Sequence, residues 1–203
     1  MSAITISRQM GSQGSQLAQQ VAERLGWRWV SRELINQAAL AAGLPEVALA
    51  EIDELGLFGL HPSTKERQAY RQQIETVIQD LAEAGQVVIV GRGGQVILRS
   101  RPDIFHVRVV APLQTRVGWF QQEKHISARA AQACLLESDR VRIRYLEQNF
   151  GAQLNDPTLY HVVINTEALG LAAAAMLVIQ TYSDWIAARS KEALPPPDRP
   201  ESA

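Results

Sequence analysis

The sequence predicts an α/β fold with a mostly parallel sheet, and three features of the chain support this. Short apolar runs alternate with longer stretches of helical periodicity along most of its length. One run, QVVIVG at residues 86–91, is almost wholly apolar, as expected of a strand covered on both faces. The 203 residues, of which 46% are hydrophobic and 20% charged, suffice for one ordinary domain with a sizeable core.

Five short runs are predicted to form the strands of this sheet. They are rich in β-branched and other apolar residues, which suit a pleated, buried surface. A Gly- and Ser-rich loop, RQMGSQGSQ, follows the first run. In chain order the runs lie at residues 3–7, 27–30, 86–91, 104–110 and 160–164.

The helices in the first half of the chain are predicted from apolar residues spaced three or four apart and from capping residues. The first helix ends at Gly26, and the second begins after the N-cap Ser31. Residues 45–63 are less regular, and a third helix follows them and ends at Gly85. The stripes of the first and third helices are Leu17, Val21 and Leu25, and Tyr70, Ile74, Val77, Ile78 and Leu81.

A helical region is predicted over residues 113–149. We expect it to break near His125 and to restart at the N-cap Ser127. A last helix is predicted over about residues 171–188. The prolines of the tail LPPPDRPESA prevent both helix and strand, so residues 191–203 are predicted to be disordered.

Charge and cysteine content exclude several classes of protein. Twenty basic and twenty-one acidic residues give a net charge of −1, which argues against a polycationic nucleic-acid binder. The single cysteine, Cys134, excludes an internal disulfide, and its place in the helical pattern predicts an inert core thiol. No signal peptide is apparent, and the longest apolar run, residues 169–179, is shorter than a membrane span. We therefore expect a cytoplasmic protein without membrane or nucleic-acid partners, of unspecified oligomeric state.

Arginines stand at or just after three of the five predicted strand ends: Arg8, Arg32 and Arg92. Ligands of parallel α/β sheets bind beyond the carboxyl ends of the strands, so this distribution predicts a local cationic site. The loop at residues 11–15 joins a strand to a helix, an arrangement that gathers backbone N–H groups around a phosphate. Taken alone, the loop is equally compatible with a glycine-containing turn that binds nothing.

Four blocks of sequence resemble the cytidylate-kinase-like proteins, relatives of bacterial cytidylate kinase. The blocks span about residues 4–166, and the resemblance is weakest at residues 45–63. It implies a P-loop, three-layer α/β/α fold with about five strands, forming a single kinase-like domain over residues 1–190. An acceptor-binding insertion would occupy about residues 31–81, and a lid about residues 118–150. The blocks are ITISRQMGSQGSQLAQQVAERLGWRWVSRELI, VVIVGRGGQVILRSRPDIFHVRVVAPLQTRV, ESDRVRIRYLEQNFG and DPTLYHVVINT.

The activity implied by this resemblance is transfer of the γ-phosphoryl group of ATP to a nucleoside monophosphate, with CMP or dCMP first. ATP and Mg²⁺ would be the cofactors, and nucleotides the partners. Such chemistry consists mainly of positioning and charge stabilisation. Arginine suits it because the planar guanidinium binds phosphate oxygens in pairs.

The resemblance also suggests roles for individual residues. Arg92 matches an arginine that holds the acceptor, and Arg32 stands near the start of the acceptor region. Arg140 and Arg144, four residues apart on one helix face, match catalytic lid arginines. Arg116 follows the fourth strand, where the family also has an arginine. The donor phosphates would lie on Gly11, Ser12, Gln13, Gly14 and Ser15, with Ser15 also ligating Mg²⁺.

Each of these arginines has a structural alternative. Arg140 could instead pair with Glu137 on a solvated helix face, which would contribute about 0.5 kcal/mol or less. Arg92 could cap a helix or brace its loop. Arg32 and Arg116 are equally compatible with a structural and a functional role.

The sequence departs from the family pattern in the phosphate-binding loop and around the acceptor. The position of the usual P-loop lysine is Gly14, and Arg8 and Gln13 replace two glycines. One hypothesis is that Arg8 supplies the missing positive charge and is catalytic. Gly93 and Val141 stand where the family has acidic residues, which puts cytidine specificity in doubt. Two alternatives remain open: a non-catalytic nucleotide- or phosphate-binding module, and a kinase with another small acceptor.

Overall fold

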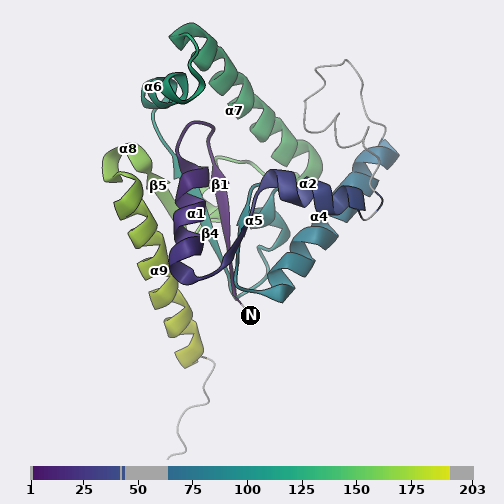
Figure 1. Cartoon of the computed structure of the whole chain (residues 1–203). Helices are drawn as coiled ribbons and strands as arrows, with labels where there is room; N and C mark the ends of the chain where they lie inside the picture. The colour runs from purple at the N-terminus through teal and green to yellow at the C-terminus, as the bar shows by residue number, and fades with distance from the viewer. Residues whose placement is uncertain (1, 42, 44–63, 193–203) are drawn as a thin grey trace, which may run out of the picture.

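The computed structural model describes residues 2–41, 43 and 64–192. Within them five parallel strands form one sheet in the order β2-β3-β1-β4-β5 (Figure 1). The first strand therefore lies at the centre, and its carboxyl end meets those of β3 and β4. The strands are β1 (Ala3–Arg8), β2 (Arg28–Val30), β3 (Val87–Val90), β4 (Ile104–Val110) and β5 (Val162–Asn165).

Helices connect the strands and cover both faces of the sheet. The helices are α1 (Gly14–Leu25), α2 (Arg32–Ala41), α4 (Thr64–Ala84), α5 (Gly94–Ile97), α6 (Leu113–Lys124), α7 (Ala128–Phe150), α8 (Thr166–Leu169) and α9 (Leu171–Glu192), with a 3-10 turn at Pro157–Leu159. α6 and α7 extend beyond the carboxyl ends of the strands and form an arm above the sheet (Figure 1).

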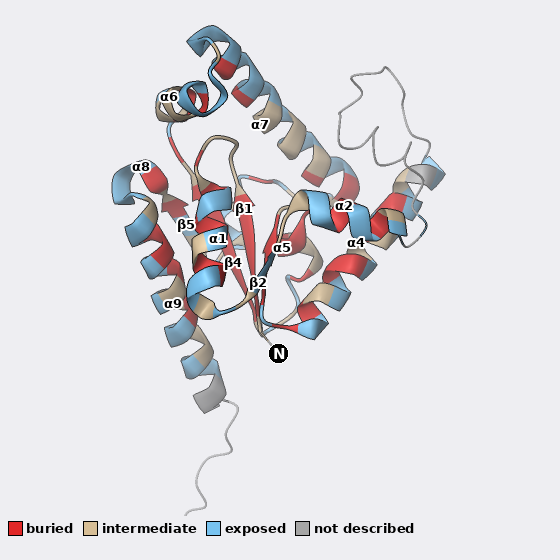
Figure 2. Cartoon of the chain, viewed as in Figure 1, coloured by how far each residue is buried: buried red, intermediate tan, exposed pale blue. Residues whose placement is uncertain are grey.

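Side chains along each strand point alternately to the two faces of the sheet, so a hydrophobic core forms on each face. Ile4 and Ile6 of β1 pack with α1 and α9 on one face. Val87 and Ile89 of β3 pack with α2 and α4 on the other. Figure 2 shows the buried strands between helices whose outer faces are exposed. The predicted three-layer α/β/α architecture is therefore confirmed, since successive side chains of a strand point to opposite faces.

The capping residues end the helices where the sequence predicts. Gly26 adopts a left-handed conformation, with φ of 66°, at the end of α1. The break between α6 and α7 lies at His125, and the Ser127 side chain accepts a hydrogen bond from the Ala130 N–H. The less regular segment, residues 45–63, and residues 193–203 of the predicted tail lie outside the described residues. Residues 191 and 192, also assigned to that tail, belong to α9.

α9 is longer than the apolar run from which it was predicted. Over Leu171–Arg189 its length and mean hydropathy of 1.3 would permit a membrane span, although only 22% of that window is buried in the protein. One side of the helix contributes Ala174, Ala175, Val178 and Tyr182 to the core with α1 and the sheet. The helix thus serves as a covering layer, as in an α/β domain.

Cys134 is exposed on α7, so the prediction of a core thiol was wrong. The buried side of α7 is instead set by Ala131 and Leu135, which pack with Val117 and Phe120 of α6. This small cluster joins the two helices of the arm. Cys134 lies one residue away from that side, a difference that sequence periodicity does not resolve.

Candidate functional site

The loop between β1 and α1 is held in an ordered curve. Gly11 and Gln13 have positive φ values of 75° and 58°. The Ser12 hydroxyl donates to the Gln9 carbonyl at 2.9 Å, and the Thr166 hydroxyl donates to the Ser12 carbonyl at 2.8 Å. These bonds fix the loop in front of the N-terminus of α1, where unpaired N–H groups and the helix dipole favour an anion.

A cavity opens over this loop, and the loop, α2, α6 and α7 all contribute to it. Trp119 and Phe120 of α6 form an aromatic wall, and Lys124 lies at the end of the same helix. The predicted loop residues Gly11, Gln13, Gly14 and Ser15 line the cavity, whereas the Ser12 side chain is buried beneath it. We call it the loop cavity; its lining also includes Arg8, Arg32, Glu33, Glu123 and Arg142.

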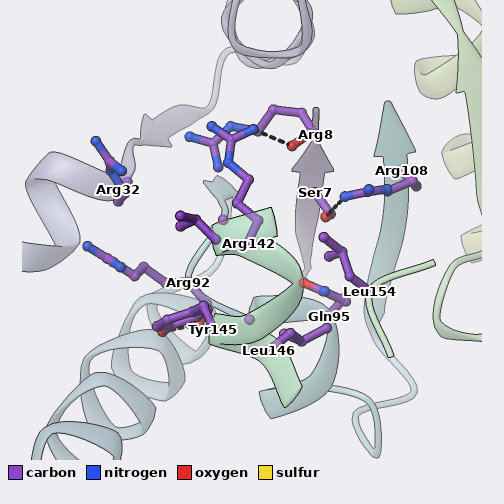
Figure 3. Close-up of a pocket in the computed structure, with 13 residues that line it drawn as sticks. Ser7, Arg8, Arg32, Arg92, Gln95, Arg108, Arg142, Tyr145, Leu146 and Leu154 are labelled. Carbon is purple, nitrogen blue, oxygen red and sulfur yellow. Dashed lines mark hydrogen bonds between the residues drawn. The ribbon is translucent and has the colours of Figure 1, made fainter. Parts of the chain in front are cut away.

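A second pocket lies beside the loop cavity at the carboxyl ends of the strands. Of the residues described by the structure, five arginines line it, and neither an aspartate nor a glutamate does. Figure 3 shows these side chains converging from β1, α2, β4, α7 and the loop after β3. We call it the arginine pocket; the five are Arg8, Arg32, Arg92, Arg108 and Arg142.

Arg8 enters the arginine pocket over two glycines. A Cβ atom at Gly91 would lie 2.4 Å from Nη1 of Arg8, and one at Gly14 would lie 2.5 Å from its Cβ. Burial, and then the positive charge of Arg142, lower the pKa of Arg8 to about 9. The guanidinium forms no ion pair within the described part of the chain. Arg8 is therefore a cation, still mostly protonated at pH 7, that lacks a carboxylate partner.

Arg142 lies next to Arg8 and was not predicted from the sequence. Its Nη1 donates to the Arg8 carbonyl at 2.8 Å, and burial, followed by the charge of Arg32, lowers its pKa to about 10. It stands on the inward side of α7, four residues before buried Leu146 and seven before buried Asn149. That spacing is the signal by which the sequence could have identified it.

Arg108 was also missed, because it lies inside the apolar run of β4. Its Nη1 donates to the Ser7 hydroxyl at 2.8 Å and its Nη2 to the Asn155 side chain at 3.4 Å. The residue is only 4% exposed, and burial lowers the pKa of its guanidinium. A single charged residue near the carboxyl end of a buried strand was the available signal.

Arg92 and Arg32 occupy the other side of the arginine pocket, as Figure 3 shows. The Nε of Arg92 donates to Oδ1 of Asn36 on α2 at 2.8 Å, and its guanidinium lies 5.5 Å from the Tyr145 ring centre. Arg32 is more exposed and pairs with the adjacent Glu33 at 3.0 Å. Both residues line the pocket, so the structure brings together three arginines that were predicted as site residues, namely Arg8, Arg32 and Arg92.

The predicted lid arginines lie elsewhere on α7. Arg140 is exposed and its Nη1 lies 3.2 Å from a carboxylate oxygen of Glu137, the structural alternative considered above. Arg144 is likewise exposed, and neither residue lines the loop cavity or the arginine pocket. The roles suggested for both by the resemblance remain predictions.

Arg116 is buried and braces the arm rather than lining either cavity. Its Nη2 lies 2.8 Å from a carboxylate oxygen of Asp139 on α7, and its Nη1 donates to the Met10 carbonyl at 3.1 Å. One side chain thus ties α6 to α7 and to the loop between β1 and α1. The contacts favour a structural role.

The donor set of the loop cavity suits a metal that is carried by phosphates. Ser15 contributes an exposed hydroxyl in the first turn of α1, where a phosphate-bound Mg²⁺ could take it as one ligand. Across the residues described by the structure, no group of three or more His, Cys, Asp or Glu could hold a metal by itself. The residues present therefore fit Mg²⁺ only when phosphate oxygens supply most of its ligands.

Comparison with known proteins agrees with this geometry. A cytidylate kinase of Pyrococcus horikoshii is 31% identical over 166 residues, which cover 80% of this chain and 79% of that protein. A uronate isomerase of Corynebacterium glutamicum is 25% identical over 154 residues, 75% of this chain but only 29% of the isomerase. A gluconokinase from Sinorhizobium meliloti 1021 has a similar fold, with a TM-score of 0.58 and 14% identity, covering 95% of this chain and 98% of the gluconokinase.

A family model also matches most of the chain. Residues 3–168 match the cytidylate kinase-like family, a span that includes the phosphate-binding loop, the arm and all five arginines of the pocket. The parallel α/β fold and its ordered strand–loop–helix turn agree with this match. The chain belongs to the cytidylate kinase-like family.

Proposed function

We propose that this protein transfers the γ-phosphoryl group of ATP to a small anionic acceptor bound in the arginine pocket. The observation that carries the proposal is the overlap of the two cavities. Arg8, Arg32 and Arg142 line both the loop cavity and the arginine pocket. A phosphoryl group passing from a donor on the loop to an acceptor in the pocket would move past these three cations.

In this reaction the protein mainly positions the two substrates and stabilises negative charge in the transition state. An ionised acceptor oxygen attacks the γ-phosphorus while the bond to the β-γ bridging oxygen breaks, and ADP leaves with that oxygen. Negative charge spread over the transferring group would be stabilised by the guanidinium groups of Arg8 and Arg142. In this arrangement Arg8 replaces the absent P-loop lysine, and Mg²⁺ would bind donor phosphates and the Ser15 hydroxyl.

CMP and dCMP are the acceptors to test first, because the chain belongs to the cytidylate kinase-like family. Another small acceptor is the second candidate, since Gly93 and Val141 line the pocket at positions suggested for base-reading acids. A non-catalytic nucleotide- or phosphate-binding module is the third, and the absent lysine favours it.

An Arg8→Ala variant tests the proposed role of Arg8. ADP release would be measured with ATP, Mg²⁺ and a panel of acceptors that begins with CMP and dCMP. Removing a preorganised donor to developing charge typically costs 10²–10³-fold in rate, so we expect a loss of roughly that size. Arg129→Met is the matched control, because Arg129 is exposed near the start of α7 and lines neither cavity.

Thermal shifts with ATP and inorganic phosphate separate the candidate functions. Stabilisation by ATP without ADP release from any acceptor would support the binding module. ADP release with CMP alone would support cytidylate kinase activity. An Arg8→Ala variant that turned over as fast as the parent would refute the role given to Arg8.

A further inference from the structure

The arginine pocket presents guanidinium groups to a ligand from several directions. Among the residues that the structure describes, five arginines line it, and no aspartate or glutamate does. Arg8, Arg108 and Arg142 form no ion pair in the described part of the chain. A buried cation that no carboxylate contacts is costly, so an anionic ligand would stabilise the pocket.

Arg108 is set apart from the arginines at the junction of the two cavities. Figure 3 shows its guanidinium reaching Ser7 from β4, whereas Arg8 and Arg142 lie on the other side of the end of β1. Arg108 lines the arginine pocket but not the loop cavity. A phosphate held by Arg8, Arg32 and Arg142 for transfer would therefore leave Arg108 without an anion.

The surroundings of Arg108 hold its guanidinium in a fixed orientation. Ser7 and Asn155 accept from its two terminal nitrogens, and its guanidinium lies 5.9 Å from the Tyr160 ring centre. Tyr160 is held in turn by a hydrogen bond to the Leu154 carbonyl at 2.9 Å. Of the five N–H donors of the guanidinium, these contacts engage two, and a carboxylate could accept two of the others.

We propose that the acceptor carries a carboxylate that binds Arg108, in addition to the phosphate group held at the junction of the cavities. This inference rests on the proposed function and specifies the class of its acceptor as a small phosphorylated carboxylic acid. Ser7 and Asn155 act as positioning residues for Arg108. A neutral nucleobase in the same place would bring no negative charge into contact with the Arg108 guanidinium.

Binding of matched ligand pairs tests this inference independently of turnover. Glycerol 3-phosphate and 3-phosphoglycerate differ only by a hydroxymethyl group in place of a carboxylate, as do glucitol 6-phosphate and 6-phosphogluconate. Calorimetric titration of the full chain, without ATP, would give the affinity ratio in each pair. We expect at least one carboxylated member to bind about tenfold more tightly than its partner, the usual scale for a charge-assisted hydrogen bond.

The variant Arg108→Met should abolish that preference and change the affinity for the partner that lacks the carboxylate by less than about threefold. Arg108→Lys keeps the positive charge and should retain part of the preference for the carboxylated ligand. It provides a second readout if the Met variant unfolds. Arg129→Met is the surface control. Equal binding within both pairs, a preference that survives Arg108→Met, or no binding of any member at millimolar concentration would each overturn the inference.

ADP release measured on the same proteins keeps the two proposals distinct. A carboxylate preference without ADP release from any of these ligands, from CMP or from dCMP would refute the phosphotransferase and leave the Arg108 site in place as a binding site. ADP release with CMP that is insensitive to Arg108→Met would refute the carboxylate inference and support the kinase.

Discussion

At the scale of single residues, Arg8 depends on the glycine at position 91. Gly91 has a φ of 85°, a conformation that L-residues rarely adopt, and it leaves the space that Nη1 of Arg8 occupies. The pocket therefore needs a residue without a side chain at this point of the loop after β3. Gly14 provides the same clearance for the Cβ of Arg8.

Gly91→Ala should weaken anion binding and also lower stability. The new Cβ would displace the Arg8 guanidinium, and the left-handed backbone would add a cost of about 1–2 kcal/mol. Calorimetric titration with inorganic phosphate and thermal unfolding would measure the two effects. Gly118→Ala is the matched control, since no atom lies within 4 Å of a Cβ added there. Unchanged phosphate affinity in Gly91→Ala would show that the position of Arg8 does not depend on a glycine at residue 91.

At the scale of elements, the rotation of α7 about its own axis decides which of its arginines face the arginine pocket. Arg140 and Arg144 share one side of the helix, and Arg142 projects from a different one, with buried Leu146 and Asn149. The sequence predicts that this stretch is a helix with three arginines. Packing against α6 and the sheet determines which of the three points inward, and a local pattern does not contain that information.

Arg116→Met should destabilise the arm formed by α6 and α7. Arg116 is buried, and its removal leaves Asp139 and the Met10 carbonyl without their donor. Breaking such a pair costs about 3 kcal/mol, measured as the free energy of unfolding in urea. Arg140→Met, which breaks an exposed pair with Glu137, should cost less than about 1 kcal/mol. Similar losses in the two variants would contradict the bracing role of Arg116.

At the scale of the whole molecule, a buried histidine at the centre of the sheet makes the stability of the fold depend on pH. His106 of β4 is 4% exposed, and its Nδ1 lies 2.7 Å from the Thr5 hydroxyl of β1. Burial, and next the charge of His161, lower the pKa of His106 to about 4 from its ordinary value of 6.5. The folded protein therefore keeps His106 neutral at pH values where the unfolded chain protonates it.

Stability should fall as the pH drops from 6.5 towards 4. Between pH 6.5 and 4 the unfolded state binds a proton at His106 and the folded state does not, so the free energy of unfolding decreases as the pH falls. Above pH 6.5 His106 is neutral in both states and causes no such loss. At 1.36 kcal/mol for each pKa unit, the loss at pH 4 is roughly 3 kcal/mol. Urea unfolding across this range would measure it. His106→Gln should flatten the profile, while His125→Gln, at an exposed helix end, should leave it unchanged.

The sequence by itself determined the order of the main elements, the parallel sheet, the helix caps and the Gly- and Ser-rich turn between β1 and α1. These features depend on residues close together in the chain, so periodicity and capping chemistry reveal them. It also placed Arg8, Arg32 and Arg92 near strand ends, although a net charge of −1 gave no sign of a cationic pocket.

Only the tertiary structure decided which arginines share that pocket. Arg108 and Arg142 reach it because β1 pairs with β4, more than 90 residues away in the chain, and because α7 lies above the end of that pair. The same packing leaves Arg140 and Arg144 in solvent. Spacing along the chain does not show which side chains lie close together in space. Five arginines repel one another, so they share a pocket only because the fold holds their backbones in place.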